Sequence, residues 1–475
     1  MKEQGHCGGP VFVCNSLLTF MLKYTILYLQ FVFFKKRLFW KRQRRLFQKM
    51  SFLEKTKGVC TKTVFFGKDD LRGKNMTFDS LAKLYYKDEK QYLTEYEKRY
   101  NAPFAYHIDF SVKQYNHKNA YDAFYYYTEE IILLVEKIYK AYEEFLYVIH
   151  SVPPVVLQQF SLLSILDEVK STNDIEGVRS TRKEIRDIID GVAPSNARFA
   201  SVVNKYHSLL TNEEIVFNTC KDIRDFYEDF AHKEIIAENP SYELDGKIFR
   251  CSSVDIVSPI GKTIHRDVMP EENIIKDMNH ALEILHNPQL PVLVRISLFH
   301  YLFAYIHPFY DGNGRTARFI TSYFLAKHFH KIAALRLSVL IKKQRTKYYN
   351  LFSVCDSEIN RGDLTPFISG FLQLLLDTFM DTIALLNRKN AQIEVYYNRI
   401  KEFAIQDTFL VDLYYILLQA ALFYGQGISM EKLVEVTKKS KGTIKSRLDS
   451  LPKEHLIVTT NRRVKYYKLN MLMFK

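Results

Sequence analysis

The chain has 475 residues, of which 47% are hydrophobic and 25% are charged, and it carries a formal net charge of +14. These shares are those of an ordinary globular protein, so they exclude a disordered or collagen-like chain. Aromatic residues make up 14% of the chain, against only 17 Gly and 13 Pro. Many large apolar side chains and few breakers predict a mainly α-helical fold rather than a turn-rich β-sandwich. At roughly 150 residues per domain, the length predicts about three domains.

The positive charge is concentrated at two places. Residues 1–50 hold ten Lys and Arg against Glu3 alone, and residues 432–468 hold eleven against three acids. The remaining part of the chain sums to −3, so the overall charge says nothing about what the middle of the chain binds. The six cysteines form no CxxC pair and no zinc-ligand spacing, which predicts reduced thiols in a cytosolic protein.

Residues 1–49 form an apolar and basic extension with two interpretations. The apolar residues 11–34 are long enough to span a bilayer, and the basic residues 35–45 behind them would stay on the cytoplasmic side. Lys23 opposes insertion, because a charge at the centre of a span costs roughly 2.5–3.5 kcal/mol. The alternative, which we favour, is a translated upstream leader with the true start at Met50. Under either interpretation, the body of the chain is expected in the cytoplasm.

Residues 50–150 are predicted to form a helical N-terminal region. Tyr, Lys and Glu recur there with helical spacing, most clearly over residues 121–148. The next region, residues 151–390, begins with a predicted helix over residues 155–175 and continues with helix over residues 199–237. The first half of the body is therefore expected to be helical throughout.

A hairpin and three helices are predicted next. β-Branched residues alternate around a Pro-Gly turn over residues 249–268, as in a β-hairpin. Helices are predicted over residues 270–285, 291–306 and 319–329. The second of them is so apolar that it must be buried on most of its faces.

Between the last two helices lies the segment HPFYDGNGRTAR, residues 307–318. Gly312 and Gly314 allow positive φ and a close approach of the backbone to a ligand. Their N–H groups stand at the start of the following helix and form a concavity that suits an anion. Arg315 and Arg318 are three residues apart, so they share one face of the first helical turn. Two arginines beside such a concavity suit a polyphosphate.

Two further residues of this segment supply chemistry. Asp311 offers one carboxylate, which is enough for Mg²⁺ when phosphates supply other oxygens. His307 ends the preceding helix and can act as a general base. An isolated histidine is more often structural, and Asn-Gly is an ordinary turn. The joint spacing of these residues between two apolar helices is not ordinary, and it favours a catalytic site.

At these residues the chain resembles the Fic family, whose motif HxFx(D/E)GNGRxxR is matched completely by residues 307–318. The resemblance implies an all-helical core with a small β-hairpin. It also implies transfer of AMP from ATP to a Tyr, Ser or Thr hydroxyl of a target protein, with the chain itself as one further target. Relatives that transfer phosphate instead carry Ala-Asn-Lys-Arg at the core of the motif, so Gly314 favours transfer of AMP.

The resemblance implies a role for each residue of the motif. His307 would deprotonate the target hydroxyl, and Asp311 would hold Mg²⁺ against the α- and β-phosphates. The phosphates themselves would lie on a further set of residues: Gly312, Asn313 and Gly314 for the α-phosphate, Arg315 for the β-phosphate and Arg318 for the γ-phosphate region.

Two implied features lie outside the motif. Tyr349 stands where the family places an aromatic residue near the adenine. Relatives often have Asn seven residues further on, but this chain departs from them with Asp356. The predicted hairpin, at residues 252–268, corresponds to the family's flap, which pairs with the main chain of the target as an added strand.

A second motif suggests regulation. Residues 172–177, TNDIEG, look like the family's inhibitory helix, (S/T)xxxE(G/N), with Thr172, Glu176 and Gly177 at its defining positions. Glu176 can pair with Arg318 and occupy the space of the γ-phosphate, so that ATP is excluded or its α-phosphate is misaligned. In some relatives the same glutamate positions water for the removal of AMP, which leaves that activity open here. A surface helix end capped by Gly177 is the alternative.

Residues 391–475 are predicted to form a separate domain with a winged helix-turn-helix. Residues 429–437 and 441–451 have the pattern of two helices, and residues 456–460 and 464–469 have the pattern of two short strands. The basic charge of this domain suits DNA phosphates. Dimerisation or protein docking through the winged helix is the alternative.

Two functional classes therefore compete. The first is an AMP transferase that is restrained by Glu176, uses ATP and Mg²⁺, and acts on a target protein, with a homodimer left open. The second is a DNA-binding regulator that contacts DNA through residues 392–475 and whose core only senses nucleotide. Intact His307 and Arg318 favour the enzyme, because a sensor needs no base.

Overall fold

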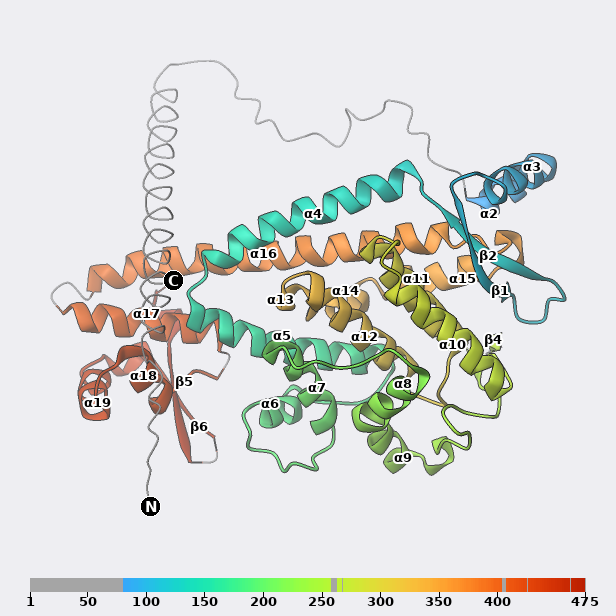
Figure 1. Cartoon of the computed structure of the whole chain (residues 1–475). Helices are drawn as coiled ribbons and strands as arrows, with labels where there is room; N and C mark the ends of the chain where they lie inside the picture. Colours follow the sequence, from blue (N-terminus) through green and yellow to red (C-terminus); the bar gives the residue numbers. More distant parts are fainter. Residues whose placement is uncertain are drawn as a thin grey trace, which may run out of the picture. The chain divides into compact units, whose positions relative to one another are not determined.

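The computed structural model describes residues 80–474 except residues 258–262, 267, 404–406, 425 and 462. The described chain is mainly α-helical, with a few small antiparallel sheets (Figure 1). This confirms the predicted fold class. The predicted extension of residues 1–49, with its anchor or leader, lies outside the described residues.

The N-terminal region contains a β-hairpin that was not predicted. After the short helices α2 (Leu81–Lys87) and α3 (Glu89–Tyr100), strands β1 (Ala105–Lys113) and β2 (Ala120–Tyr126) pair antiparallel before α4 (Glu129–His150) begins.

The predicted helix over residues 121–148 is therefore wrong in its first part. The Thr128 side chain caps α4 by accepting a hydrogen bond from the N–H of Ile131, so the helix cannot extend further back. On the other side, Phe124 of β2 donates to the carbonyl of Gly362 and accepts from the N–H of Leu364. Pairing with residues far along the chain overrides the local helical spacing.

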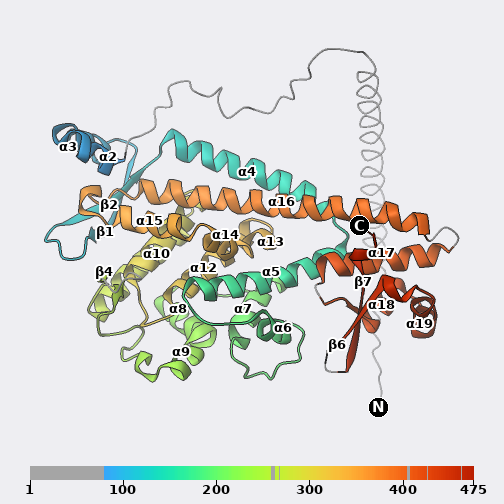
Figure 2. The same cartoon turned by 180° about the vertical axis from the view of Figure 1, so that it is seen from behind.

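Two long helices lie side by side in the fold. α16 (Thr365–Phe403) lies alongside α4, as both views show (Figures 1 and 2). Residues Thr365–Glu402 are long and apolar enough to cross a membrane, but 50% of the most apolar window is buried inside the protein, and the core helix of a soluble protein passes the same test. The predicted domain boundary between residues 390 and 391 falls inside α16, and the division into domains stays a prediction.

The predicted helix over residues 155–175 is confirmed as α5 (Pro154–Ile175). It ends at Ile175 with Glu176 as its C-cap, and Gly177 follows with a left-handed φ of +77°. A short helix, α6 (Arg182–Ile189), comes next. The stretch predicted as helix over residues 199–237 is divided in the structure, because Asn212 turns left-handed at φ 58°. Its helices are α7 (Ala200–Thr211), α8 (Cys220–Tyr227), a π-helical turn (Glu228–His232) and α9 (Lys233–Glu238).

The predicted hairpin is present as the antiparallel strands β3 (Asp255–Val257) and β4 (Thr263–Arg266), and its tip lies outside the described residues. α10 (Glu271–His286) and α11 (Val292–Ile306) begin and end within one residue of their predicted bounds. α12 begins at Asn313, inside the motif, rather than at residue 319; it spans Asn313–His328. The remaining helices of this region are α13 (Lys331–Ala334), α14 (Leu337–Lys343) and α15 (Arg345–Cys355).

α11 lies in the middle of these helices and fixes the position of the motif. It packs against α10, α12 and α16, and nearly all of its side chains are buried, as its apolar sequence predicts. The residues that follow it therefore leave the core at a defined point.

The C-terminal segment matches its predicted elements closely. Its three-stranded sheet has the order β5-β7-β6, with two short helices between the first two strands in the sequence. This arrangement is compatible with a winged helix. The elements are α17 (Thr408–Phe423), β5 (Ile428–Ser429), α18 (Met430–Thr437), α19 (Lys441–Asp449), β6 (Leu456–Asn461) and β7 (Val464–Leu469).

Candidate active site

The motif forms a tight turn between α11 and α12 that its own side chains close. His307 leaves α11 with a left-handed φ of 53°, and Gly312 enters α12 at φ 80°. The Asn313 amide donates to the carbonyl of Phe309 at 2.7 Å and accepts from its N–H at 3.0 Å. The Thr316 hydroxyl donates to the carbonyl of Gly312 at 2.9 Å. The Asn313 side chain is thus used to lock the turn, which leaves its main-chain N–H for an anion.

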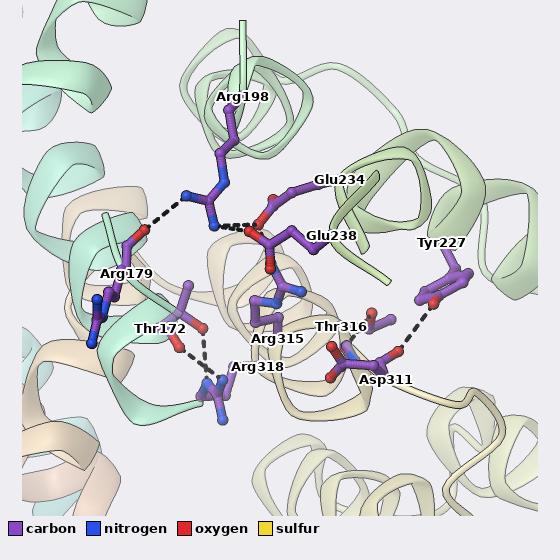
Figure 3. Close-up of polar contacts among 11 residues, drawn as sticks. Thr172, Arg179, Arg198, Tyr227, Glu234, Glu238, Asp311, Arg315, Thr316 and Arg318 are labelled. Carbon is purple, nitrogen blue, oxygen red and sulfur yellow. Dashed lines mark hydrogen bonds and ion pairs between the residues drawn. The ribbon is translucent and has the colours of Figure 1, made fainter. Parts of the chain in front are cut away.

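The turn is also anchored to the helices behind it. The buried Phe309 ring stacks on Tyr227 of α8 with 3.6 Å between ring centroids, and the Tyr227 hydroxyl donates to the carbonyl of Asp311 at 3.0 Å (Figure 3). A side chain on Gly312 would crowd the helices that pack against the turn. A Cβ there would lie 2.7 Å from Cδ1 of Ile235 on α9. Glycine is therefore favoured at position 312 by its left-handed φ of 80°, and a larger residue would also have to displace the end of the Ile235 side chain.

The geometry at His307 assigns its tautomer. Nδ1 lies 3.3 Å from the carbonyl oxygen of Ala304. A carbonyl oxygen can only accept, so Nδ1 carries the hydrogen and Nε2 keeps the lone pair. The side chain is half-buried. Nε2 is therefore the nitrogen of His307 that can accept a proton.

Arg318 is held by the end of α5. Its guanidinium is 1% exposed; Nη2 lies 2.7 Å from Oε1 of Glu176, and Nε donates to the Thr172 hydroxyl at 2.9 Å. Nη2 also donates to the carbonyl of Thr172 at 3.3 Å (Figure 3). Burial lowers the pKa of Arg318, but the Glu176 carboxylate outweighs it and raises the pKa above its usual value. The predicted ion pair between the two motifs is therefore present.

The Glu176 carboxylate lies directly over Gly314. A Cβ at position 314 would lie 2.2 Å from Oε1 of Glu176 and 3.0 Å from Nη1 of Arg318. Gly314 belongs to the first turn of α12, and no side chain caps that helix end. A carboxylate at an uncapped helix N-terminus is favourable for the same reason that a phosphate would be, because both meet the positive end of the helix dipole. Glu176 thus occupies the place where an anion would bind.

Arg315 is held by a second carboxylate, on α9. It is 1% exposed and donates to Oε1 of Glu234 at 3.2 Å. Arg198 approaches the same oxygen at 3.8 Å, contacts Glu238, and donates to the carbonyl of Arg179 at 3.1 Å (Figure 3). Burial raises the pKa of Glu234 against the opposing arginine charges. The two ion pairs of Glu234 and the hydrogen bond of Arg198 to Arg179 connect Arg315 to the segment that follows the end of α5.

Asp311 and Tyr349 are both partly accessible to solvent. The Asp311 carboxylate accepts a hydrogen bond from the N–H of Gly312 at 2.6 Å and is half-buried. The Tyr349 side chain on α15 is 40% exposed. Desolvation raises the pKa of its hydroxyl, and the nearby Glu176 carboxylate adds to the effect. Tyr349 therefore stands close to Glu176, at the edge of the space that the carboxylate fills.

Asp356 has a partner inside the protein. One of its carboxylate oxygens accepts a hydrogen bond from the Tyr301 hydroxyl at 2.7 Å. Desolvation raises the pKa of Asp356 to about 7. The family resemblance predicts an amide at this position. A carboxyl differs from an amide in charge and in hydrogen-bonding capacity.

Three residues of the site were not predicted: Tyr227, Glu234 and Arg250, which donates to the carbonyl of His307 at 2.8 Å. Each contacts a motif residue that lies far away in the sequence, with separations of 84, 81 and 57 residues. No local pattern marks them, so sequence periodicity could not have found them.

A comparison with protein families decides what this arrangement is. Residues 222–325 match the model of the Fic/DOC family. The chain contains a Fic domain. The matched part includes the whole turn from His307 to Arg318, but not Thr172, Glu176, Tyr349 or the C-terminal segment.

Named relatives carry the same domain. The chain is 33% identical over 95 residues to a protein adenylyltransferase Fic of Drosophila virilis, which is 20% of this chain and 18% of that protein. A protein of the same name from Drosophila melanogaster is 35% identical over 83 residues, 18% of this chain and 15% of the relative. The chain thus spans less than a fifth of the length of these relatives.

Solved structures of Fic proteins are similar in part. A Fic family protein from Desulfovibrio desulfuricans aligns with a TM-score of 0.45 and 20% identity, over 72% of this chain and 97% of that one. The assignment of the domain comes from the family match and the geometry of the turn.

Proposed function

We propose that the protein transfers AMP from ATP to a hydroxyl side chain of a target protein. One observation carries the proposal: the junction of α11 and α12 brings together a general base, an uncapped helix N-terminus and two buried arginines. The Drosophila relatives that share the Fic domain are named protein adenylyltransferases, which supports the same reaction and a protein as the acceptor.

In this reaction Nε2 of His307 takes the proton of the target hydroxyl as its oxygen attacks the α-phosphorus. The new bond forms to the α-phosphorus, the bond to the oxygen bridging the α- and β-phosphates breaks, and pyrophosphate leaves. The N–H groups of the first turn of α12, around Gly314, stabilise the charge that develops on the α-phosphate. Arg315 and Arg318 neutralise the leaving pyrophosphate.

A magnesium ion fits this site only together with the nucleotide. Within the described residues no group of three or more His, Cys, Asp or Glu side chains could hold a metal ion alone. Asp311 supplies one hard oxygen ligand, and phosphate oxygens and water would supply the rest, as is usual for Mg²⁺. The bound ion would draw charge from the phosphates, while Asp311 fixes its place beside the turn.

Glu176 restrains the reaction in the state described here. Its carboxylate lies over Gly314 and pairs with Arg318, so a triphosphate and this carboxylate compete for one space. Arg318 would have to exchange Glu176 for a phosphate before ATP binds productively. Tyr349, which stands beside Glu176, is placed to contact the base or ribose of that nucleotide.

Incubation with Mg²⁺ and α-labelled ATP tests the proposal through self-labelling of the chain. We expect weak label on the wild type, stronger label on Glu176→Gly and none on His307→Ala. Label that persists in His307→Ala would exclude the base role. Equal label on wild type and Glu176→Gly would exclude the restraint. Removal of AMP and a homodimer stay predictions.

A second candidate function, DNA binding through residues 392–475, is favoured by one observation. Lys441 and Lys445 lie one turn apart on the exposed side of α19, and Lys438 before it and Lys465 on β7 are exposed as well. Exposed cations on a helix and an adjacent strand suit phosphates of a duplex. Under the regulator hypothesis the Fic domain only senses nucleotide, and the full chain would retard DNA but transfer no AMP.

A further inference from the structure

Arg250 connects the end of α11 with the two segments that flank the β3–β4 hairpin. Its side chain is fully buried, and its guanidinium donates to main-chain carbonyls in three separate stretches of the chain. The acceptors are His307 at 2.8 Å from Nε, Ser252 at 2.8 Å from Nη1, and Val268 at 3.1 Å and Ile306 at 3.2 Å from Nη2.

These acceptors have a clear geometric meaning. Ser252 and Val268 flank the β3–β4 hairpin on its two sides, while Ile306 and His307 form the end of α11. The main-chain N–H of Arg250 also donates to the carbonyl of Pro308 at 3.3 Å. Carbonyls at the end of α11 carry the negative end of the helix dipole, which compensates part of the buried positive charge.

The segment that carries Arg250 is itself fixed. The Glu271 carboxylate, at the start of α10, accepts the N–H groups of residues 247, 248 and 249 at 3.1, 2.7 and 2.9 Å. Burial opposes the ionised form, but these three donors lower the pKa of Glu271 below its usual value. Arg250 therefore reaches the turn from a rigid support rather than from a loose loop.

Hydrogen bonds of Tyr310 also link the turn to the segment before the hairpin. The hydroxyl of Tyr310, in the catalytic turn, donates to Asp245 at 2.8 Å and accepts from the N–H of Ser252 at 3.1 Å. The same Asp245 carboxylate oxygen accepts the N–H of Cys251 at 2.8 Å. The segment before the hairpin is thus linked to the turn on both sides of Pro308, through His307 and through Tyr310.

We propose that Arg250 is a positioning residue. It holds His307 at a fixed position relative to Ser252 and Val268, the two ends of the hairpin segment. This role rests on the proposed transfer of AMP. It includes no contact between Arg250 and ATP. His307 adopts a left-handed φ of 53°, which a residue with a Cβ adopts only when its surroundings hold it there. Arg250 supplies that hold through the His307 carbonyl, so the base and the place where a target's main chain docks keep a fixed separation.

The inference predicts a selective kinetic defect. Arg250 does not contact Arg315 or Arg318, whose partners are Glu234, Thr172 and Glu176, so the affinity for ATP should stay the same. Misplacing a reacting group by about 1 Å costs on the order of 100-fold in rate. We therefore expect kcat for AMP transfer to fall about 10- to 100-fold in Arg250→Lys, with an unchanged Kd for ATP.

The experiment uses the full chain in the Glu176→Gly background. Self-labelling rates with α-labelled ATP and calorimetric ATP affinities are compared for Arg250→Lys, Arg250→Ala and a control, Arg99→Lys. Arg99 is a buried arginine in α3 that pairs with Glu95 at 2.9 Å. Millimolar guanidinium should restore transfer in Arg250→Ala, because the ion can refill the space, and should not change the control.

Hydrogen exchange separates this inference from the proposed function. Arg250→Lys should speed amide exchange in both residues 250–254 and residues 306–309, whether or not the protein transfers AMP. If Glu176→Gly transfers no AMP, the proposed function fails, and exchange alone decides on Arg250. Faster exchange in only one of the two segments, or a loss of ATP affinity as large as the loss of rate, would overturn the positioning role.

Discussion

The turn between α11 and α12 and the C-terminal segment both carry positive charge, but they place it in opposite ways. In the turn, Arg315 and Arg318 are 1% exposed and each is held by a carboxylate from another helix. In the C-terminal segment, Lys441 and Lys445 are exposed on the surface of α19. Burial fixes the orientation of a charged side chain and strengthens its electrostatic interactions. An exposed charge is screened by water and salt.

Buried, paired charges suit catalysis, whereas exposed charges suit electrostatic attraction of a partner. The proposed transfer of a nucleotidyl group needs charges within a fraction of an ångström of a defined place, which buried and paired side chains provide. A duplex needs a diffuse positive surface, for which exposed lysines are sufficient. Substitutions in the turn should therefore have large and specific effects, and substitutions on α19 should have small and salt-dependent ones.

The largest effect is expected at His307. Replacing the base with alanine in the Glu176→Gly background should lower AMP transfer roughly 1,000-fold, because general-base catalysis contributes about 100- to 10,000-fold. Labelling rates with α-labelled ATP measure it. Lys445→Ala, on α19, serves as the matched control and should transfer AMP at the rate of its parent. A comparable loss in both variants would remove the distinction between the two regions.

A smaller effect is expected from the pair between Glu234 and Arg315. Glu234→Ala leaves Arg315 buried without its carboxylate, which should lower the free energy of unfolding by about 3 kcal/mol. The exposed pair of Lys221 and Asp225 on α8, with side chains 74% and 56% exposed, is the comparison. Asp225→Ala should change stability by less than about 0.5 kcal/mol. Urea unfolding measures both, and equal losses would contradict the account.

Glu168 of α5 should give the protein a pH dependence. Its buried carboxyl accepts the N–H of Ser338 at 2.9 Å, and burial raises its pKa from 4.5 to about 7. A raised pKa favours the protonated folded state, so its stabilisation is complete below pH 4.5 and is lost as the pH rises through 7.

Glu168→Gln cannot ionise and should lack this loss. The wild type should lose roughly 2–3 kcal/mol relative to the variant between pH 4.5 and 8. Urea unfolding at several pH values measures the difference. The exposed Glu454, replaced by Gln, should leave the pH dependence of the wild type intact. A constant difference between wild type and Glu168→Gln would show that Glu168 does not titrate in this range.

The smallest effect is expected on α19. Replacing both Lys441 and Lys445 with Gln should change the free energy of unfolding by less than about 0.5 kcal/mol. If these lysines contact DNA phosphates, each substitution should reduce the salt slope of DNA affinity by about 1. Gel retardation at several salt concentrations measures it. An unchanged slope would remove α19 from any DNA contact.

The same contrast explains what could be predicted from the sequence. α5, α10 and α11 were predicted within about a residue, because apolar spacing and a proline or glycine at the ends are local signals. β2 was assigned to a helix, although it pairs with β1 and, at Phe124, with Gly362 and Leu364 far along the chain. Strand pairing at such a distance leaves no local pattern.

The candidate site divides in the same way. The turn was visible because its residues are contiguous, and the pair of Glu176 with Arg318 was expected only through the family resemblance. Arg250 and Glu234 were missed, since their roles exist only through contacts made in the folded chain.

The central claim, that the turn transfers AMP once Glu176 is displaced, is tested most directly with two labels. The Glu176→Gly chain is incubated in parallel with α-labelled and γ-labelled ATP in the presence of Mg²⁺. The account predicts covalent label from the α-phosphate only, with a mass increase of one AMP group per modified site. Covalent label from the γ-phosphate, or no label from either while ATP still binds, would contradict it.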